Sequence, residues 1–191
     1  QWSQRLKAGA LILSTHGRRG LARLALGSFA ETTILASQKI PVLVLNPEHT
    51  IPKTINKVLV PTDLSKASHR FVTDMVPLMK SWGCGMHLFY KRPDPLDPII
   101  QQGVYSLGGG WISAQSFLDD ESDRNTKDLK ALEHRVQKAG VPCTSVVDTA
   151  PENLADGINR EVKKEKADMI ALVTQTGPLA ATLLGSVARD L

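Results

Sequence analysis

The 191-residue chain is poor in cysteine and in aromatic side chains, and it contains no long hydrophobic run. Cys84 and Cys143 are its only cysteines, too few for a disulfide framework, so a reducing compartment, the cytoplasm, is expected. No apolar stretch approaches the roughly 18 residues that indicate a membrane-spanning helix, so no membrane partner is predicted. Charged residues make up 22% and hydrophobic residues 42%, which is typical of a globular chain with a sizeable core.

Common catalytic and metal-binding patterns are also missing. No Ser-His-Asp or Cys-His set can be recognised, and no lysine stands in a P-loop pattern, so no catalytic residue is predicted. Cys84 and His87 form a lone Cys-x-x-His with no second pair at metal-ligand spacing. The spacing therefore predicts no metal site.

Positive charge is concentrated near the start of the chain. Residues 1–46 hold six Lys/Arg and one acidic residue, a net charge of +5, whereas the other 145 residues hold 17 basic and 18 acidic residues. The excess surrounds a glycine-rich segment with Arg18, Arg19 and Arg23, which suits a phosphate ligand, although a solvated basic face is the alternative. Because no aromatic residues interleave these arginines, a nucleic-acid partner is not predicted.

The glycine-rich segment lies between two short apolar runs, residues 10–13 and 41–45. The first is expected to be a strand covered on both faces, and the second is expected to be another apolar strand. The Gly-Ser pair at 27 and 28 is followed by Glu31, which makes a capping box and predicts that a helix begins at Ser28. Backbone N–H groups at such a helix N-terminus favour an anion such as phosphate.

This segment resembles the nucleotide-binding signature of the universal stress protein family: Gly, two residues, Gly, nine residues, then Gly and Ser or Thr. Gly17 and the Gly27–Ser28 pair have the nine-residue spacing, whereas Ser14 stands where the signature has its first glycine. The resemblance implies an α/β fold with an open five-stranded parallel sheet of order 3-2-1-4-5 and helices on both faces, the adenine nucleotide alpha hydrolase-like fold. Alternating β and α segments predict the same architecture independently.

A degenerate copy of the segment ends the chain. Gly185–Ser186 repeats the Gly27–Ser28 pair, which indicates tandem domains rather than a solenoid. Only seven residues separate Gly177 from Gly185, and Pro178, which lacks a donor N–H, stands where the first copy has arginine. The second loop is therefore expected to hold phosphate more weakly.

The domain boundaries follow from this repeat. Residues 1–46 are expected to be the C-terminal part of a first universal stress domain, 47–56 a linker, and 57–191 a second domain that lacks its last strand. The chain is thus interpreted as a fragment of a longer tandem protein.

Two segments compete for the place beside the strand predicted at 57–60. The segment 169–173 is preferred over 10–13, because its crossover from the strand at 144–147 is short and can be right-handed. Residues 1–46 would then complete a neighbouring sheet or pair across an interface, and Asp63 would face the weaker second loop. Another strand is predicted at 86–90, and residues 42–45 are expected to supply the edge strand, the fifth.

Three local features complete the pattern. Ser65 is expected to cap a helix that Pro77 kinks or ends early. Residues 92–113 are expected to form an irregular loop, and a helix is expected to follow over 116–139.

The predicted site joins the glycine loop to the end of the strand at 57–60. The resemblance implies that Asp63 contacts a nucleoside, while a cap or turn role is the alternative reading of Thr-Asp-Leu-Ser. The expected ligand is ATP or a related adenine nucleotide, with Mg²⁺ only alongside it. The candidate nucleotide-binding residues are Pro61, Thr62, Asp63, Gly17, Arg18, Gly27 and Ser28, with a weaker second loop at Gly177, Gly185 and Ser186.

The resemblance therefore implies a nucleotide-binding regulator of stress response that acts as a dimer. The alternatives are an interaction module of the same fold without nucleotide and, with less support, an enzyme such as a slow ATPase. The apolar, uncharged strand at 41–45 invites pairing with another chain, which predicts a homodimer or a pseudo-dimer between repeats.

Overall fold

The computed structural model describes residues 10–14, 33, 41–45, 52–92 and 111–173, with the backbone alone for residues 111–121. The chain divides into two compact units, residues 1–53 with 174–191, and residues 54–173. None of the described helices is both long enough and apolar enough to cross a bilayer.

In the first unit, strand β1 (Leu11–Ser14) pairs in parallel with strand β2 (Val42–Leu45). The register runs from Leu11 opposite Val42 to Ser14 opposite Leu45. Both apolar runs therefore form strands, as predicted. Strand β1 is not covered on both faces, because Ile12 is 66% exposed. Within the described residues, these two strands form a two-stranded sheet apart from the larger one, in which residues 42–45 lie beside 11–14. That residues 1–46 complete a neighbouring sheet is the arrangement expected when 169–173 takes the place beside 57–60.

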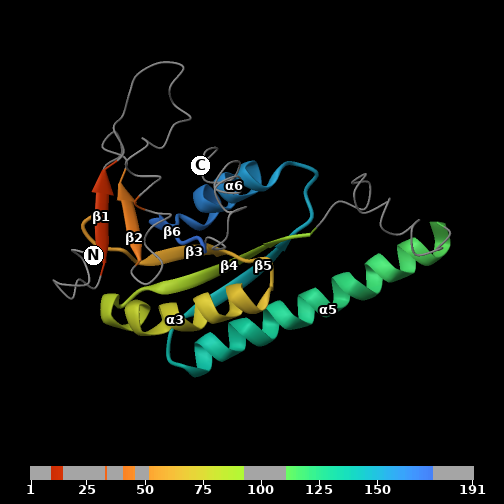
Figure 1. The fold of residues 1–191 in the computed structure, drawn as a ribbon, viewed down its shortest axis with the longest axis horizontal. Coiled ribbons are helices and arrows are strands. Elements are labelled where there is room, and N and C mark those ends of the chain that lie inside the picture. Colours follow the sequence, from red (N-terminus) through yellow and green to blue (C-terminus); the bar gives the residue numbers. More distant parts are fainter. Residues whose placement is uncertain (1–9, 15–32, 34–40, 46–51, 93–110, 174–191) are drawn as a thin grey trace, which may run out of the picture. The chain divides into compact units, whose positions relative to one another are not determined.

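The second unit contains a four-stranded parallel sheet of order β5-β4-β3-β6 (Figure 1). If the four strands of this unit are numbered 1 to 4 along the chain, their order in the sheet is 3-2-1-4. This confirms the predicted order for these four strands. The strand next to β3 is β6, so the in-order arrangement is correct. The strands are β3 (Lys57–Pro61), β4 (Gly85–Lys91), β5 (Cys143–Asp148) and β6 (Met169–Ile170).

Asp168 ties the start of β6 to the start of β3. Its Oδ2 accepts hydrogen bonds from the backbone N–H groups of Asn56 at 2.7 Å and Lys57 at 3.1 Å. Its own N–H donates to the Lys57 carbonyl at 2.9 Å. Two paired residues, Met169 and Ile170, make up β6, which is shorter than the predicted 169–173.

Helix α3 (Lys66–Trp82) begins at its predicted cap, because the Ser65 hydroxyl accepts from the Ser68 N–H at 3.2 Å. It ends at Gly83, whose φ of 68° is left-handed. Pro77 does not end α3, which continues to Trp82, so the expectation of an early end is wrong. The proline is exposed, while Met75 and Met79 on the same helix are buried and hold it against the core.

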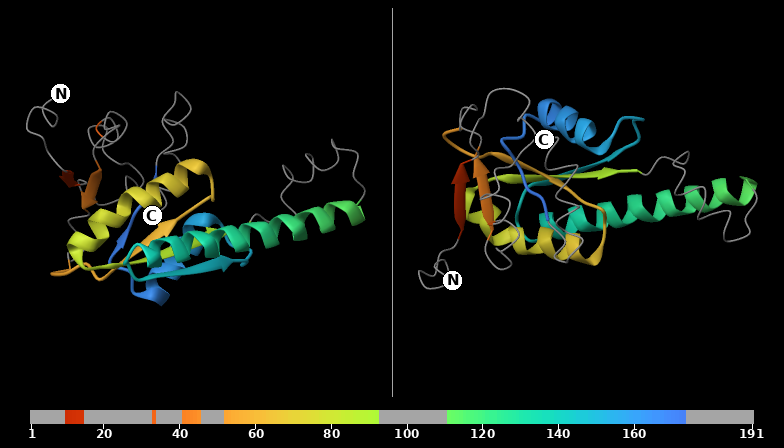
Figure 2. Two further views of the ribbon diagram at one scale, coloured as in Figure 1. Left: turned by 90° about the horizontal axis from the view of Figure 1, so that it is seen from below. Right: turned by 45° about the horizontal axis from the view of Figure 1, so that its top comes forward.

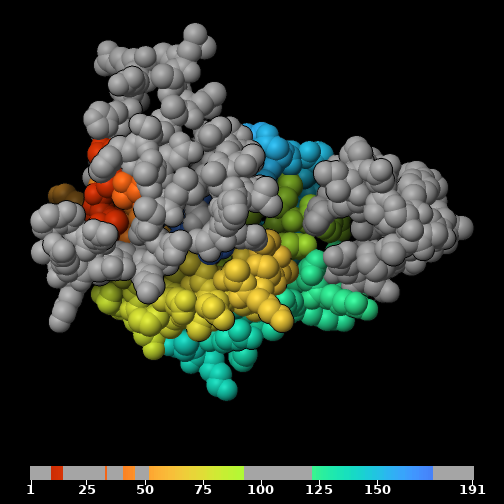
Figure 3. All heavy atoms as spheres, viewed as in Figure 1, coloured from red at the N-terminus to blue at the C-terminus, as the bar shows by residue number. Residues whose placement is uncertain are grey.

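Helices cover both faces of this sheet (Figures 1 and 2). Helices α3 and α5 (Trp111–Lys138) lie on one face, and α6 (Leu154–Glu165) lies on the other. Figure 3 shows the described parts of α3 and α5 side by side. Because α5 begins at Trp111, the last part of the expected loop is helical, and residues 93–110 lie outside the described ranges.

Side-chain alternation along β4 explains the two-sided core. Met86, Leu88 and Tyr90 join a buried cluster with residues of α3 and α5, including Leu129 and Leu132. Between them lie His87 and Phe89, which face α6 because successive strand residues point to opposite sides. Strand β4 is therefore buried on both faces, as is usual for a parallel strand that helices cover on both sides.

Candidate functional site

The predicted strand-end residues lie at the carboxyl edge of the larger sheet. Pro61 ends β3, and the Thr62 N–H donates to the Phe89 carbonyl at 2.9 Å, which extends the pairing with β4 by one residue. Thr62 is buried, and its hydroxyl oxygen accepts from the Leu64 N–H at 3.1 Å. These bonds fix the point at which Asp63 leaves the sheet.

Asp63 is exposed and is held by the turn that starts α3. Its Oδ1 accepts from the Ser65 N–H at 2.9 Å and from the Ser68 hydroxyl. Burial alone would raise the pKa of Asp63, but the hydrogen bonds from Ser68 and Ser65 outweigh it and lower the pKa. Asp63 thus has the turn role that was one of its two predicted readings, and it is a carboxylate at neutral pH.

The direction of the chain reverses beside Asp63. From β3 the chain crosses through α3 to β4 on one side, whereas β6 reaches the other side of β3 from α6 on the opposite face. In open α/β sheets, ligands bind in the crevice at such a switch point, outside the carboxyl ends of the strands. Asp63 follows the central strand of this switch point.

Pro61, Thr62 and Asp63 are consecutive residues at this edge, and their part in binding a nucleotide stays a prediction. The other candidate residues lie outside the described part of the chain, so their roles remain predictions: Gly17, Arg18, Gly27, Ser28, Gly177, Gly185 and Ser186.

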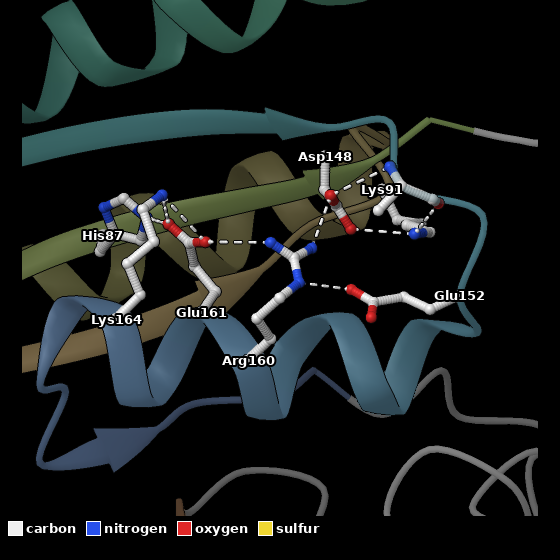
Figure 4. A network of polar contacts seen from close by, with 8 residues as sticks. His87, Lys91, Asp148, Glu152, Arg160, Glu161 and Lys164 are labelled. Carbon is white, nitrogen blue, oxygen red and sulfur yellow. Dashed lines mark hydrogen bonds and ion pairs between the residues drawn. The ribbon is translucent and has the colours of Figure 1, made fainter.

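An ion-pair network that the sequence did not predict joins the ends of β4 and β5 to α6 (Figure 4). Asp148 is buried; its Oδ2 lies 2.9 Å from the Lys91 Nζ, and its Oδ1 lies 2.7 Å from the Arg160 Nη2. Arg160 also donates from Nε to Glu152 at 2.6 Å. Burial on its own would raise the pKa of Asp148, but hydrogen bonds, first that from Lys91, outweigh it and lower the pKa.

Gly157 allows α6 to approach this network closely. A Cβ atom at this position would lie 2.9 Å from Asp148 Oδ2 and 3.2 Å from the Phe89 ring. Both distances are too short for an ordinary contact, so the close packing of α6 on the sheet requires glycine here.

A second polar cluster, centred on His87, lies under the same helix. The His87 Nε2 is 3.2 Å from Glu161 Oε1, and both side chains are almost fully buried. Lys164 reaches the same Glu161 oxygen at 2.9 Å, and Lys57 lies 2.8 Å from Glu165 Oε2. The hydrogen bond from Lys57 lowers the pKa of Glu165.

Cys84 does not share a site with His87. Its thiol packs in the core cluster, 3.3 Å from the Met79 sulfur, whereas His87 faces α6. Burial raises the pKa of Cys84, and it raises the pKa of Cys143 to about 12, which disfavours the nucleophilic thiolate form of both residues. Both cysteines are free, and no disulfide joins them.

The sheet order and the helices on both faces define a doubly wound α/β protein whose switch point lies at β3. The universal stress protein family model matches residues 54–191, and the chain belongs to that family. Comparison with curated proteins gives no match.

Solved structures of the family share the fold. A universal stress protein from Archaeoglobus fulgidus DSM 4304 is 17% identical, with a TM-score of 0.63 over 98% of this chain and 58% of that one. A universal stress family protein from Burkholderia pseudomallei is 15% identical, with a TM-score of 0.50 over 72% of this chain and 91% of that one. At these identities the likeness concerns the fold alone.

Proposed function

We propose that this chain is a nucleotide-binding regulator of stress response that holds an adenine nucleotide at the carboxyl edge of β3. The observation that carries this proposal is Asp63, an exposed and ionised carboxylate anchored by Ser65 and Ser68 beside the switch point. Family membership and the nine-residue spacing between Gly17 and the Gly27–Ser28 pair support it.

Each part of the ligand has a chemical counterpart in this proposal. Because both of its internal hydrogen bonds use Oδ1, Asp63 presents Oδ2 to ribose hydroxyls or to the base. The phosphates lie against the loop from Gly17 to Ser28, where arginines supply positive charge, and Mg²⁺ enters only with them. The loop from Gly177 to Ser186 is the weaker phosphate site, since Pro178 lacks an N–H.

The first test is a thermal-shift titration with Mg·ATP. At a nucleotide concentration about 100 times the Kd, the free energy of unfolding should rise by about 2.7 kcal/mol. For a domain of this size that corresponds to a rise in Tm of about 5–10 °C. Asp63→Asn keeps an oxygen for Ser65 and Ser68 but loses the charge, so we expect affinity to fall about 10- to 100-fold.

Asp74→Asn is the matched control, because Asp74 is exposed on α3, away from the carboxyl edge. It should leave affinity unchanged. The same titration on Gly17→Val tests the loop, where a side chain should fill the space of a phosphate and abolish binding. Equal affinity in wild type and Asp63→Asn would remove Asp63 from the site, and release of phosphate from ATP would reveal a slow ATPase.

The second candidate function is an interaction module of the same fold that binds no nucleotide. Ser14, which replaces the first glycine of the signature, and the degenerate second loop favour it. No stabilisation by any adenine nucleotide would support this candidate over the first. Both candidates place the protein in the cytoplasm, in keeping with its two free thiols.

Both candidates act as a dimer through strand β2. The strand is short, apolar and uncharged, which favours pairing with a second chain or with the other repeat. Lysine at both Val42 and Val44 should convert dimers to monomers in light scattering, because like charges would meet across the interface. Threonine at both positions keeps the branched shape without charge and should leave the dimer intact. A monomeric wild type at high concentration would contradict the proposal.

A further inference from the structure

We propose that His87, Glu161 and Glu165 form a binding site for Zn²⁺ on the α6 side of the sheet, separate from the nucleotide edge. One ligand atom from each of the three residues lies within 4.8 Å of the other two. The set combines an imidazole from β4 with two carboxylates from α6. One imidazole and two carboxylates suit Zn²⁺, whose open sites use three protein ligands and one water.

His87 is already oriented for this role by Thr144. The His87 Nδ1 lies 2.7 Å from the Thr144 hydroxyl oxygen, the second contact that commonly fixes a metal-binding histidine. When Nδ1–H donates to Thr144, the lone pair of Nε2 points at Glu161 Oε1, 3.2 Å away. In the other tautomer Nε2–H donates to Glu161 and Nδ1 accepts from the Thr144 hydroxyl, which satisfies both contacts without metal. Zinc binding selects the first tautomer, in which the Nε2 lone pair is available as a ligand.

The two carboxylates lie on one face of α6 because residues four positions apart are neighbours on a helix. Glu161 is the inner ligand, with 2% of its side chain exposed, and Glu165 is the outer ligand, with 25% exposed. Because Glu165 is the more exposed of the two, it is the carboxylate that an ion from solvent would meet first. Without metal, Lys164 Nζ contacts both Glu161 oxygens, at 2.9 and 3.2 Å, and Arg160 Nη1 lies 4.0 Å from Oε2.

Two lysines balance these carboxylates without metal. Lys164 binds Glu161 and Lys57 binds Glu165, and their side chains are 58% and 36% exposed. Both long side chains can turn outward into water. A dication carries the same charge as the two ammonium groups that it displaces, so the exchange keeps the cluster neutral. The lysines therefore compete with the metal.

The test uses the full chain, stripped of metal by a chelator and titrated with Zn²⁺ alone by calorimetry. We expect one saturable ion per chain, and visible absorption bands of tetrahedral geometry when Co²⁺ replaces Zn²⁺. His87→Gln, Glu161→Gln and Glu165→Gln should each weaken binding at least about tenfold, since each removes a ligand. Lys164→Gln should tighten binding severalfold, because it removes a competing cation.

His134→Gln is the matched control, since His134 is exposed on α5, and it should not change binding. Circular dichroism checks that each variant is folded. If His87→Gln or Glu161→Gln unfolds, the affinities of Glu165→Gln and Lys164→Gln for Zn²⁺ test the proposal instead. These two substitutions change partly exposed side chains, so both variants should stay folded. Absence of binding in the wild type would overturn the proposal, as would unchanged affinity in Glu165→Gln and Lys164→Gln. Omitting nucleotide keeps this result independent of the nucleotide site.

Discussion

Replacing Asp148 with alanine is expected to lower the free energy of unfolding by about 3 kcal/mol, which is measurable by urea denaturation. Asp148 is 7% exposed and binds both Lys91 and Arg160. The Lys91 side chain is only 16% exposed, so the substitution leaves a largely buried ammonium group without its carboxylate. Breaking a buried pair costs about 3–5 kcal/mol, and the partial exposure of both cations favours the low end.

Glu152→Ala is the control, because it removes the more exposed carboxylate partner of Arg160. We expect a loss below about 1 kcal/mol, as for most surface ion pairs. The two variants should also differ in acid. The pKa of Asp148 is lower in the folded than in the unfolded chain, so its stabilisation is present above the unfolded value, about 3.9. It is lost as pH falls through the folded pKa, and Asp148→Ala should lack that acid-dependent loss. Equal stabilities for wild type and Asp148→Ala would contradict this account.

Phe89→Ala is expected to have the largest effect on stability, a loss of about 3–5 kcal/mol. The Phe89 side chain is fully buried between β4 and α6, and its ring lies against the place where Gly157 has no Cβ. Removing the ring leaves a cavity, because the backbone pairing on both sides of β4 prevents collapse. Urea or thermal unfolding measures the loss.

Phe89→Leu is the matched control and should cost much less, because it keeps most of the apolar volume. A double variant, Phe89→Ala with Asp148→Ala, tests whether the two side chains act together. Both lie within 3.2 Å of the position that a Cβ atom at Gly157 would take, and neighbours of this kind are commonly non-additive. A loss below about 1 kcal/mol for Phe89→Ala would show that α6 packs more loosely than described.

Local sequence rules predicted most of the described fold. Apolar runs located every described strand, and Ser65 marked the start of α3. The rules failed where the tertiary structure outweighs local preference. Pro77 lies on the exposed side of a helix whose other side is anchored by buried methionines, and residues 111–113 are helical rather than irregular.

The candidate sites also divide into a part that local sequence predicts and a part that only tertiary packing creates. Asp63 was predictable because it directly follows a strand, and its turn contacts are local. The contact between His87 and Glu161 was not predictable, because Glu161 lies 74 positions further along the chain. The available signals were a histidine inside an apolar strand and two glutamates four positions apart. No spacing rule joins residues that only the packing of α6 on the sheet brings together.

The hydrogen bond from the Asn56 N–H to Asp168 has a consequence for folding kinetics. It spans 112 positions, whereas β3 meets β4 through the short crossover that contains α3. A loop roughly four times longer raises the entropy cost of closure by about 1.2 kcal/mol, and distant pairings form late. The pairing of β3 with β6, limited to two residues, is therefore the last part of the sheet to form. The switch point beside Asp63 thus becomes complete only at the end of folding, after the rest of the core has assembled.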